Sequence, residues 1–418
     1  MIEERLQDIL KLAETEETPF YCLDLKRIRK KASDFVSAWM RVFPSGRVAY
    51  SYKTNSLRAV TRIMRECGLM AEIVSGAELH WAFSDGFVGE QILFNGPYKS
   101  EAELADAIKA DVRIQFDSIE ELLRILDIAT ATGTKPRISP RLAIMRDREL
   151  SRLGLSVSEY KHAAALAQRQ GFRFSGLHFN VGSNNSCSVP YLAALALHKD
   201  VIRDLISHSQ QPPWIDIGGG LPASSIGQAG IPFHAEDLAK DLATFFAREN
   251  INSENFILAV EPGRCLTEDF GVLVTRVVAL KERARETILI VDAGTNFLRT
   301  MSKWYHPVTV VSDSLQQGET KDYKIYGSQC RESDLFGAIN DSNSDIKTGD
   351  LIIYGNSGAY DIPNSNVWIR SAPAIVGFEE NRQVLIRRRE TYSEMRSLDA
   401  CRRVLQSCLK TDAPEGHL

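Results

Sequence analysis

The stretch RVAYSYKTNSLRAVTRIMRECGLMAEIVS, residues 47–75, contains a strand, a helix and a second strand in close succession. RVAYSY and AEIVS are short apolar runs typical of buried strands, and between them apolar residues recur at three- and four-residue steps. Two strands joined by a helix form a parallel pair. The turn after the first strand reads KTNS and lacks the glycine-rich sequence that opens a dinucleotide-binding sheet. This unit therefore favours a closed barrel over an open doubly wound sheet.

The same alternation of strand and helix continues from about residue 26 to about residue 270. Several helical segments begin at a capping residue, for example Ser75, Ser100 and Asp117. Eight such units predict a (β/α)8 barrel of the TIM type over residues 26–270. The predicted strands are RVAYSY, AEIVS, QILFN, RIQFD, RISPRLAI, SGLHFNV, WIDIG and FILAV.

The pattern changes after residue 270, where strand-like runs are separated by polar turns. These runs predict a C-terminal β domain over residues 271–418, and the early run PFYCLDL is expected to join it, so residues 1–25 belong to the same domain. The runs are FGVLVTRVVALKE, TILIVDAG, DYKIYGSQC, DLIIYGNSGAY and APAIVGFEENRQVLIRR.

Composition and charge narrow the class of protein. The formal net charge of -4 argues against a general affinity for nucleic acid or anionic membranes, and no apolar run has the length needed to cross a bilayer. The acidic, amphipathic N-terminus is unlike a signal peptide. The seven cysteines are scattered without CxxC spacing, which predicts a reducing compartment and no metal site. We therefore expect a cytoplasmic protein.

Polar and small residues follow six of the predicted strands, and in a (β/α)8 barrel these strand ends meet on one rim, where reactive groups lie. A lone lysine after a strand is usually a solvated charge, and a run of glycines is often an ordinary turn. Together, however, three glycines without side chains and a nearby arginine let an anion such as phosphate approach closely. The rim residues are Lys53, Glu72, Arg141, Asn180, Ser183, Gly218, Gly219, Gly220, Glu261, Gly263 and Arg264.

Along nearly its whole length the chain resembles the fold-type III pyridoxal phosphate decarboxylases, the family of diaminopimelate, ornithine and arginine decarboxylases, and it is most similar to the diaminopimelate branch. The resemblance implies an alanine-racemase-like barrel with a β domain, working as a homodimer with active sites at the subunit interface. The motifs that carry it are TPFYCLDL, AYSYKTN, AEIVSGAEL, SRLGL, GLHFNVGS, DIGGGLP, EPGRCL, VDAGTNFLR, YGSQCRESDLF and GNSGAY.

The resemblance also implies pyridoxal 5'-phosphate as the cofactor. Lys53 matches the lysine that holds it as a Schiff base, which requires an amine that can lose its proton. Glu261 is similar to the carboxylate that keeps the pyridine nitrogen protonated, so that the ring accepts electrons from Cα. Glu72 and Arg141 correspond to an acid and an arginine that pair beneath the cofactor. The positions that match phosphate contacts are Ser183, Gly218, Gly219, Gly220, Arg264 and Tyr360, and Gly263 is also expected in the cofactor site.

Cys330, in GSQCRESD, matches the cysteine that the partner subunit contributes in this family, where it helps to protonate Cα after CO2 leaves. A lone cysteine is more often a small buried apolar residue. The surrounding motif favours the catalytic interpretation, and Asp334 keeps the acidic position that closes the motif.

Asn180 stands where the family has a histidine that lies flat against the cofactor ring. An amide can cover the ring but cannot carry positive charge. His178, two residues earlier, points to the same side of the strand and is expected to substitute in part. We therefore expect cofactor binding with an altered rate or reaction specificity.

Arg331 follows Cys330 where relatives have an acidic residue that meets the distal ammonium group of the substrate. The reversed charge disfavours a free diamino acid and favours a carboxylate or phosphate. Arg299, in NFLR, resembles an arginine that binds a substrate carboxylate, and Tyr305 lies in the shortened loop that follows. These residues suggest an anionic, conjugated or carrier-linked amino acid as substrate.

Three functions are compatible with this pattern. The first is decarboxylation of an amino acid or derivative with Lys53 and Cys330 both in use. The second is racemisation or another reaction at Cα, but racemases of this fold place an arginine at the pyridine nitrogen, so Glu261 favours the first. The third is a non-catalytic binding protein, which Asn180 alone favours.

Overall fold

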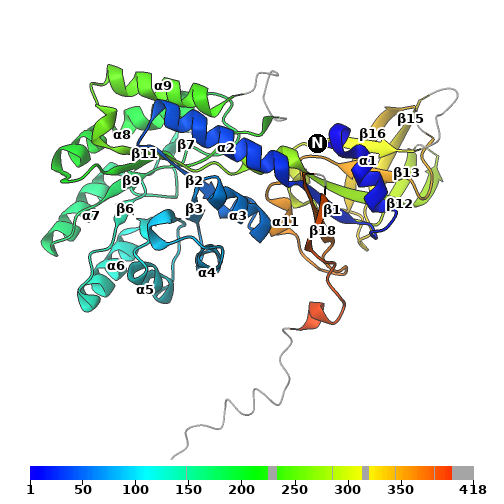
Figure 1. Ribbon diagram of the computed structural model, residues 1–418, viewed down its shortest axis with the longest axis horizontal. Coiled ribbons are helices and arrows are strands. Elements are labelled where there is room, and N and C mark those ends of the chain that lie inside the picture. Colours follow the sequence, from blue (N-terminus) through cyan, green and yellow to red (C-terminus); the bar gives the residue numbers. More distant parts are fainter. Residues whose placement is uncertain are drawn as a thin grey trace, which may run out of the picture.

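The computed structural model describes residues 1–146, 148–224, 233–284, 286–312, 320–343, 345–380 and 382–397, and all eight predicted barrel strands form in it (Figure 1). The strands lie side by side, all parallel, in the order β6-β5-β4-β3-β2-β11-β10-β9. They are β2 (Arg47–Ser51), β3 (Met70–Ile73), β4 (Ile92–Phe94), β5 (Arg113–Phe116), β6 (Ile138–Pro140), β9 (Gly176–His178), β10 (Trp214–Asp216) and β11 (Ile257–Val260).

Hydrogen bonds between the two outer strands of this sheet close it into a barrel. Ser175 N donates to Ile138 O at 2.8 Å, and Leu142 N donates to His178 O at 2.7 Å. The predicted (β/α)8 barrel is therefore confirmed. A short hairpin, β7 (Met145–Arg146) and β8 (Glu149–Leu150), follows β6.

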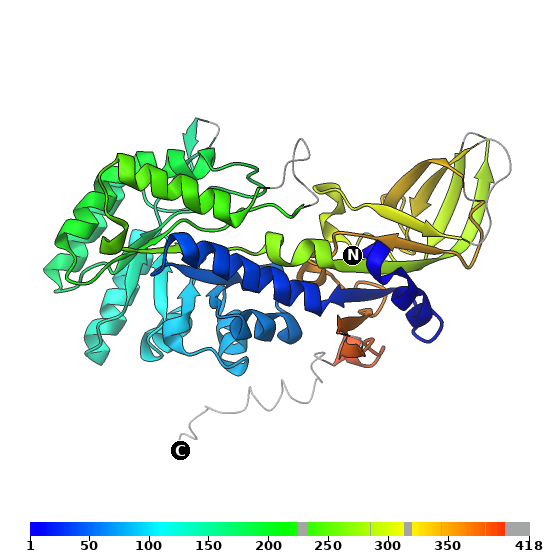
Figure 2. The ribbon, with the colours of Figure 1, turned by 45° about the horizontal axis from the view of Figure 1, so that its top comes forward.

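The helices that connect the strands surround the barrel in both ribbon views (Figures 1 and 2). They turn apolar faces inward: in α6, Leu122, Ile125 and Ala129 recur at helical spacing and are buried. Ser75 and Ser100 cap their helices as predicted, but α6 is capped by Ser118 and not by Asp117. The helices are α2 (Leu25–Val42), α3 (Arg58–Glu66), α4 (Gly76–Ser84), α5 (Glu101–Lys109), α6 (Ile119–Thr132), α7 (Val157–Arg169), α8 (Val189–His208), α9 (Ala235–Arg248) and the short α10 (Arg264–Thr267).

The inside of the barrel has two layers because side chains on one face of a strand repeat every second residue. The lower layer is a separate apolar cluster made of Ala49, Met70, Leu93, Trp214 and Ala259. Two residues further along each of these strands the sequence places a polar group, and these form the upper layer: Ser51, Glu72, Asn95, Asp216 and Glu261. The apolar layer therefore lies directly beneath the polar residues.

A second sheet lies beside the barrel, at the right of Figure 2, with the strand order β16-β15-β13-β12-β1-β18-β19, while β17 pairs with β12 and β14. The predicted participation of PFYCLDL is confirmed, because β1 pairs antiparallel with β12 and parallel with β18. The strands are β1 (Phe20–Asp24), β12 (Gly271–Arg283), β13 (Glu286–Val291), β14 (Val308–Val311), β15 (Lys321–Tyr326), β16 (Leu335–Ser342), β17 (Leu351–Tyr354), β18 (Ala374–Glu379) and β19 (Arg382–Arg387).

Helix α1 (Ile2–Ala13) packs its apolar side on this sheet, with Ile9 and Leu12 in one cluster with Phe20 and Val274. The short helix α11 (Asp361–Asn364) follows β17. We propose that residues 26–270 form one domain and residues 1–25 and 271–418 the other, a division that the membership of the strands supports. Residues 398–418 lie outside the described part of the chain. Among the described helices, none combines the length and apolar character that crossing a bilayer requires.

Candidate active site

A cavity of about 580 Å³ opens at the carboxyl ends of the barrel strands, a size usual for small-molecule sites. Most of the residues predicted for cofactor binding line it, although they come from distant parts of the chain. They are Lys53, Glu72, Arg141, His178, Asn180, Ser183, Gly219, Gly220, Glu261, Gly263, Arg264 and Tyr360.

Lys53 lies in a single turn of 3-10 helix, η1 (Tyr52–Thr54), directly after β2. Its Nζ lies 2.7 and 3.0 Å from the two carboxylate oxygens of Glu72, which is fully buried and also accepts from Ser51 Oγ. Burial alone lowers the pKa of Lys53, but the charges of Glu72 and Glu261 outweigh burial, and the net pKa is raised. The two carboxylates therefore favour the ammonium form of the Lys53 amine.

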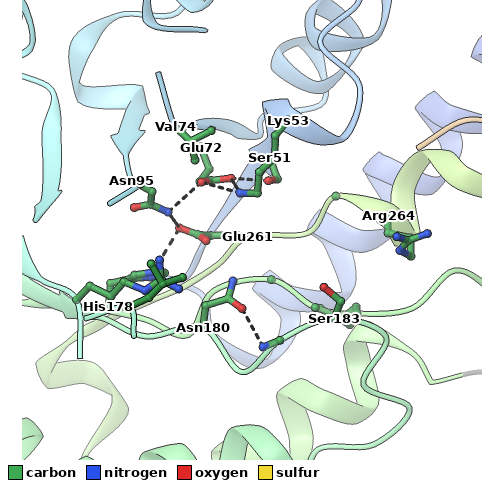
Figure 3. A pocket seen from close by; sticks show the side chains of 18 of the residues that line it. Ser51, Lys53, Glu72, Val74, Asn95, His178, Asn180, Ser183, Glu261 and Arg264 are labelled. Carbon is green, nitrogen blue, oxygen red and sulfur yellow. Dashed lines mark hydrogen bonds and ion pairs between the residues drawn. The ribbon is translucent and has the colours of Figure 1, made fainter. Parts of the chain in front are cut away.

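Glu261 follows β11 in the centre of the site, 3% exposed, where Asn95 Nδ2 donates to its Oε1 at 2.6 Å (Figure 3). Burial, and then the negative charges of Asp216 and Glu72, hold the pKa of Glu261 well above its usual range. A cation beside this carboxyl group would stabilise its ionised form against both burial and the neighbouring negative charges. The site therefore favours a positively charged partner at Glu261.

His178 is 1% exposed, and its Nδ1 lies 3.7 Å from Asp216 and 3.8 Å from Glu261. Burial lowers the pKa of His178, although the carboxylates of Asp216 and Glu72 act in the opposite direction. Asp216 is held in place by Gln115 Nε2 at 2.7 Å and by the Gly218 backbone N–H at 3.0 Å. His178 and Asn180 both line the cavity, which agrees with the prediction that they point to the same side of the strand.

Asn180 also lines the cavity, but its side-chain oxygen is used locally. Oδ1 accepts from the Gly182 backbone N–H at 2.9 Å, so the amide shapes the turn that leads to Ser183 (Figure 3). This contact gives Asn180 a role in the loop that the histidine comparison did not predict.

The glycine turn after β10 is required by close backbone contacts. A Cβ on Gly219 would lie 2.3 Å from Glu261 O, and one on Gly220, which has a φ of +101°, would lie 2.4 Å from Gly182 O. Gly218 has a φ of +70° and does not itself line the cavity among the residues described, but its carbonyl accepts from Glu261 N at 2.9 Å. The turn and the carboxylate at position 261 are therefore built as one unit.

Arg264 lines the cavity at the end away from His178 (Figure 3). It is 4% exposed and forms an ion pair with Glu268, and its guanidinium lies 3.9 Å from the Trp304 ring centroid and 4.8 Å from that of Tyr360. Its Nη2 is buried and has no hydrogen-bond partner in the described residues. This nitrogen is a donor available to an anion.

Tyr360 links the β-rich sheet to the lysine turn. Its backbone N–H donates to Thr54 O at 2.7 Å, and its φ of +67° lies in the left-handed region that non-glycine residues rarely adopt. Asn55 Nδ2 also donates to Gly358 O at 3.0 Å. The position of Lys53 therefore depends on both parts of the chain.

The residues predicted to act on substrate lie elsewhere. Cys330 is exposed on the loop after β15, and Arg331 donates to Thr295 Oγ1 at 2.7 Å and lies 5.4 Å from the Trp368 ring. Arg299, in η7 (Arg299–Ser302), is exposed, as is Tyr305. None of these is among the described residues that line the cavity of their own chain.

Asp334 differs from the other residues of this group because it is buried. It accepts from the backbone N–H groups of Thr295 and Gln329 at 2.8 and 2.9 Å, and its side chain is 1% exposed. In this structure it shapes the loop that carries Cys330.

Three polar residues of the upper layer were not predicted as site residues: Ser51, Asn95 and Asp216. Each lies two residues after an apolar residue that points into the barrel. The two-residue period along RVAYSY, QILFN and WIDIG could therefore have indicated that these polar side chains also point inward.

The residues that line the cavity fit pyridoxal phosphate. Buried Arg264 Nη2 and the side-chain-free glycine turn suit a phosphate at one end, and the carboxylate cluster suits a protonated ring nitrogen at the other. The ligand atoms of His178, Asp216 and Glu261 lie within 4.8 Å of one another, a spacing that also suits a metal ion. The amine of Lys53, which lines the same cavity beside Glu72, is a group that a coenzyme aldehyde requires and a metal ion does not.

Comparison with known families and proteins gives a consistent result. Residues 25–268 match the profile of the pyridoxal-dependent decarboxylase family, pyridoxal binding domain. The chain is 29% identical to diaminopimelate decarboxylase of Methanothermobacter thermautotrophicus over 93% of each chain. It is 30% identical to that of Deinococcus radiodurans, over 90% of this chain and 93% of the relative.

Solved structures agree with the sequence relatives. Diaminopimelate decarboxylase from M. jannaschii in complex with L-lysine superposes with a TM-score of 0.85, at 26% identity and over 95% of each chain. Lysine/ornithine decarboxylase from Vibrio vulnificus, at 19% identity, has a TM-score of 0.76 over 90% of this chain and 99% of its own, and this similarity concerns the fold alone.

Proposed function

The chain belongs to the pyridoxal-dependent decarboxylase family, and we propose that Lys53 and Glu261 hold the coenzyme with which it decarboxylates amino acids. It is a pyridoxal-phosphate-dependent amino acid decarboxylase, and racemisation or a non-catalytic role is not favoured by its relatives. The observation that carries the residue assignment is the meeting of a lysine amine, a buried carboxylate and an unpaired guanidinium nitrogen in one cavity.

Each residue has a defined task in this proposal. Glu72, 2.7 Å from Nζ, is placed to accept the proton that Lys53 must lose before it can attach to an aldehyde. Glu261 would hold a proton on the ring nitrogen, and Arg264, Ser183 and the glycine turn would bind the phosphate. When bound, pyridoxal phosphate supplies an electron sink for the electron pair left at Cα.

Decarboxylation breaks the bond between Cα and the carboxyl carbon, so that CO2 leaves, and the electron pair stays at Cα until a proton is added there. We assign that proton donation to the Cys330 thiol. Because Cys330 does not line its own cavity among the described residues, we propose that it acts in the cavity of the partner subunit of a homodimer.

Arg331, which directly follows Cys330, and Arg299 support an anionic or conjugated amino acid as substrate, since both cations are exposed. Diaminopimelate is the second candidate, because the relatives named above act on it, and its distal carboxylate would also suit an arginine. Free lysine and ornithine present only an ammonium group at that end, which Arg331 would repel.

The substrate assignment is tested by CO2 release from a panel of neutral, basic, acidic and acyl-linked amino acids, with diaminopimelate included. We expect release from acidic or acyl-linked members, its loss in Lys53→Ala, and a weaker preference for anions in Arg331→Glu. Release from lysine or ornithine, without release from acidic or acyl-linked members, would overturn the anionic assignment.

The shared site is tested by mixing two inactive variants, Lys53→Ala and Cys330→Ala, in equal amounts. If sites form between subunits, half of the dimers are mixed and each restores one site, so about a quarter of wild-type activity returns. No recovery, with subunit exchange confirmed by mass, would contradict a site shared between subunits.

A further inference from the structure

Asn95 stands after β4 in the polar layer of the barrel and is 5% exposed. Its backbone N–H donates to Ile73 O at 2.8 Å, so the residue is fixed to the neighbouring strand β3. Its side chain is therefore aimed by the sheet itself and not by a mobile loop.

The side-chain NH2 of Asn95 donates to two carboxylates at once. Nδ2 lies 3.0 Å from Glu72 Oε1 and 2.6 Å from Glu261 Oε1 (Figure 3). An amide nitrogen carries two hydrogens, and both have an acceptor here. Asn95 Oδ1 is buried without a hydrogen-bond partner in the described residues, so the amide is oriented by the donors alone.

This contact spans the barrel. β4 and β11 are separated by β3 and β2 in the strand order, so no backbone ladder joins Asn95 to Glu261. Glu72 in turn contacts Nζ of Lys53 at 2.7 Å. A continuous chain of contacts therefore runs from Lys53 through Glu72 and Asn95 to Glu261.

The chain of contacts joins two buried carboxyl groups, those of Glu72 and Glu261. The neutral amide cannot compete for a proton, and its donors favour the ionised form of each carboxylate. Without it, Glu72 and Glu261 would face each other with one fewer donor each. The charged and titratable groups around them are Lys53, Glu78, Asp216, His178, Arg141 and Tyr360.

We propose that Asn95 is a positioning residue that couples the carboxylate at Lys53 to the carboxylate at the coenzyme ring, and so sets the proton affinity of the attached coenzyme. The inference rests on the function proposed above. Replacing the amide by Asp removes both donors and adds an acceptor at nearly constant volume, whereas Ala removes the donors alone. As a general estimate, a negative charge about 6 Å from a titrating group, at an effective dielectric constant of about 20, raises the pKa of that group by roughly two units.

The test is the pH midpoint of the visible absorption band of the bound coenzyme, measured beside the coenzyme dissociation constant and the thermal unfolding midpoint. Asn95→Asp should raise the pH midpoint by about one to two units, because it adds a negative charge, whereas Asn95→Ala should lower it, because the two carboxylates lose donors that favour their ionised forms. Asn296→Asp is the matched control, because Asn296 is a buried amide in the other part of the chain that donates to Asn366 O at 2.8 Å. It should lower stability and leave the pH midpoint unchanged.

A pH midpoint unchanged in both Asn95 variants that still bind coenzyme would overturn the proposal. Loss of coenzyme binding in a folded Asn95 variant, with binding kept in Asn296→Asp, would support a positioning role. If wild-type protein gives no visible band, or if Lys53→Ala keeps one, the proposed function itself fails, and this outcome is distinct from an unchanged pH midpoint.

Discussion

Gly219→Ala tests the claim that the glycine turn and Glu261 form one unit. The new Cβ would lie 2.3 Å from Glu261 O, whereas Cβ contacts under 3.0 Å are essentially never seen, so the turn or the carboxylate must move by at least 0.7 Å. Overpacking of this kind costs about 1–3 kcal/mol of folding stability. A displacement near 1 Å in a ligand site can cost about 100-fold in function.

We therefore expect Gly219→Ala to remain folded, with a lower urea midpoint and a coenzyme dissociation constant increased at least about tenfold. Coenzyme titration by absorbance and urea unfolding measure the two effects. Gly171→Ala is the control, since Gly171 has a φ of +80° and open space around its Cβ position, and it should lose about 1 kcal/mol of stability while binding coenzyme normally. Unchanged coenzyme affinity in Gly219→Ala would refute the argument from close contact.

Three further predictions concern single side chains. Trp304→Ala removes the ring that lies 3.9 Å from the Arg264 guanidinium. Loss of this cation–π contact, worth about 1 kcal/mol, should weaken coenzyme binding about fivefold in an absorbance titration. An unchanged coenzyme affinity would contradict a role for Trp304. Asn180→Ala loses the bond to Gly182 N and should weaken coenzyme binding by a similar factor, whereas tighter binding would show that the amide does not order the turn. Burial raises the pKa of Asp361 to about 7, so the folded protein keeps a proton on this carboxyl group that the unfolded chain releases near pH 4. The protonated carboxyl group therefore favours the folded state at low pH, and this contribution to the free energy of unfolding is lost as pH rises towards 7. Wild-type stability should therefore fall by up to about 3 kcal/mol more than that of Asp361→Asn between pH 5 and pH 8 in urea unfolding, and parallel curves would contradict the shift.

The barrel could be predicted from sequence because its strands are short apolar runs separated by amphipathic segments, and this local periodicity survives in the folded protein. Strands β14 and β16 were not predicted, because VTVV is short and LFGAINDS contains glycine and polar residues. Their strand state depends on pairing with β17 and β15, which lie elsewhere in the sequence. The cap of α6 was misplaced by one residue because Asp117 and Ser118 are both good capping residues.

The cavity could be predicted from one rule, that reactive groups follow the carboxyl ends of barrel strands. The same rule would have found Asn95, which follows the third barrel strand, β4, but a lone asparagine gives no chemical signal in sequence. Its importance depends on distances to Glu72 and Glu261 that only folding creates. The burial of Asp334 was likewise hidden, because it results from the loop folding over its own carboxylate.

The central claim is that the amine of Lys53 carries the coenzyme. Protein loaded with pyridoxal phosphate can be treated with borohydride, which makes the attachment permanent, and the modified peptide located by mass spectrometry. The account predicts that the added mass is found on the peptide that contains Lys53 and is absent in Lys53→Ala. Attachment to a different lysine, or unmodified Lys53 in protein that releases CO2, would contradict it.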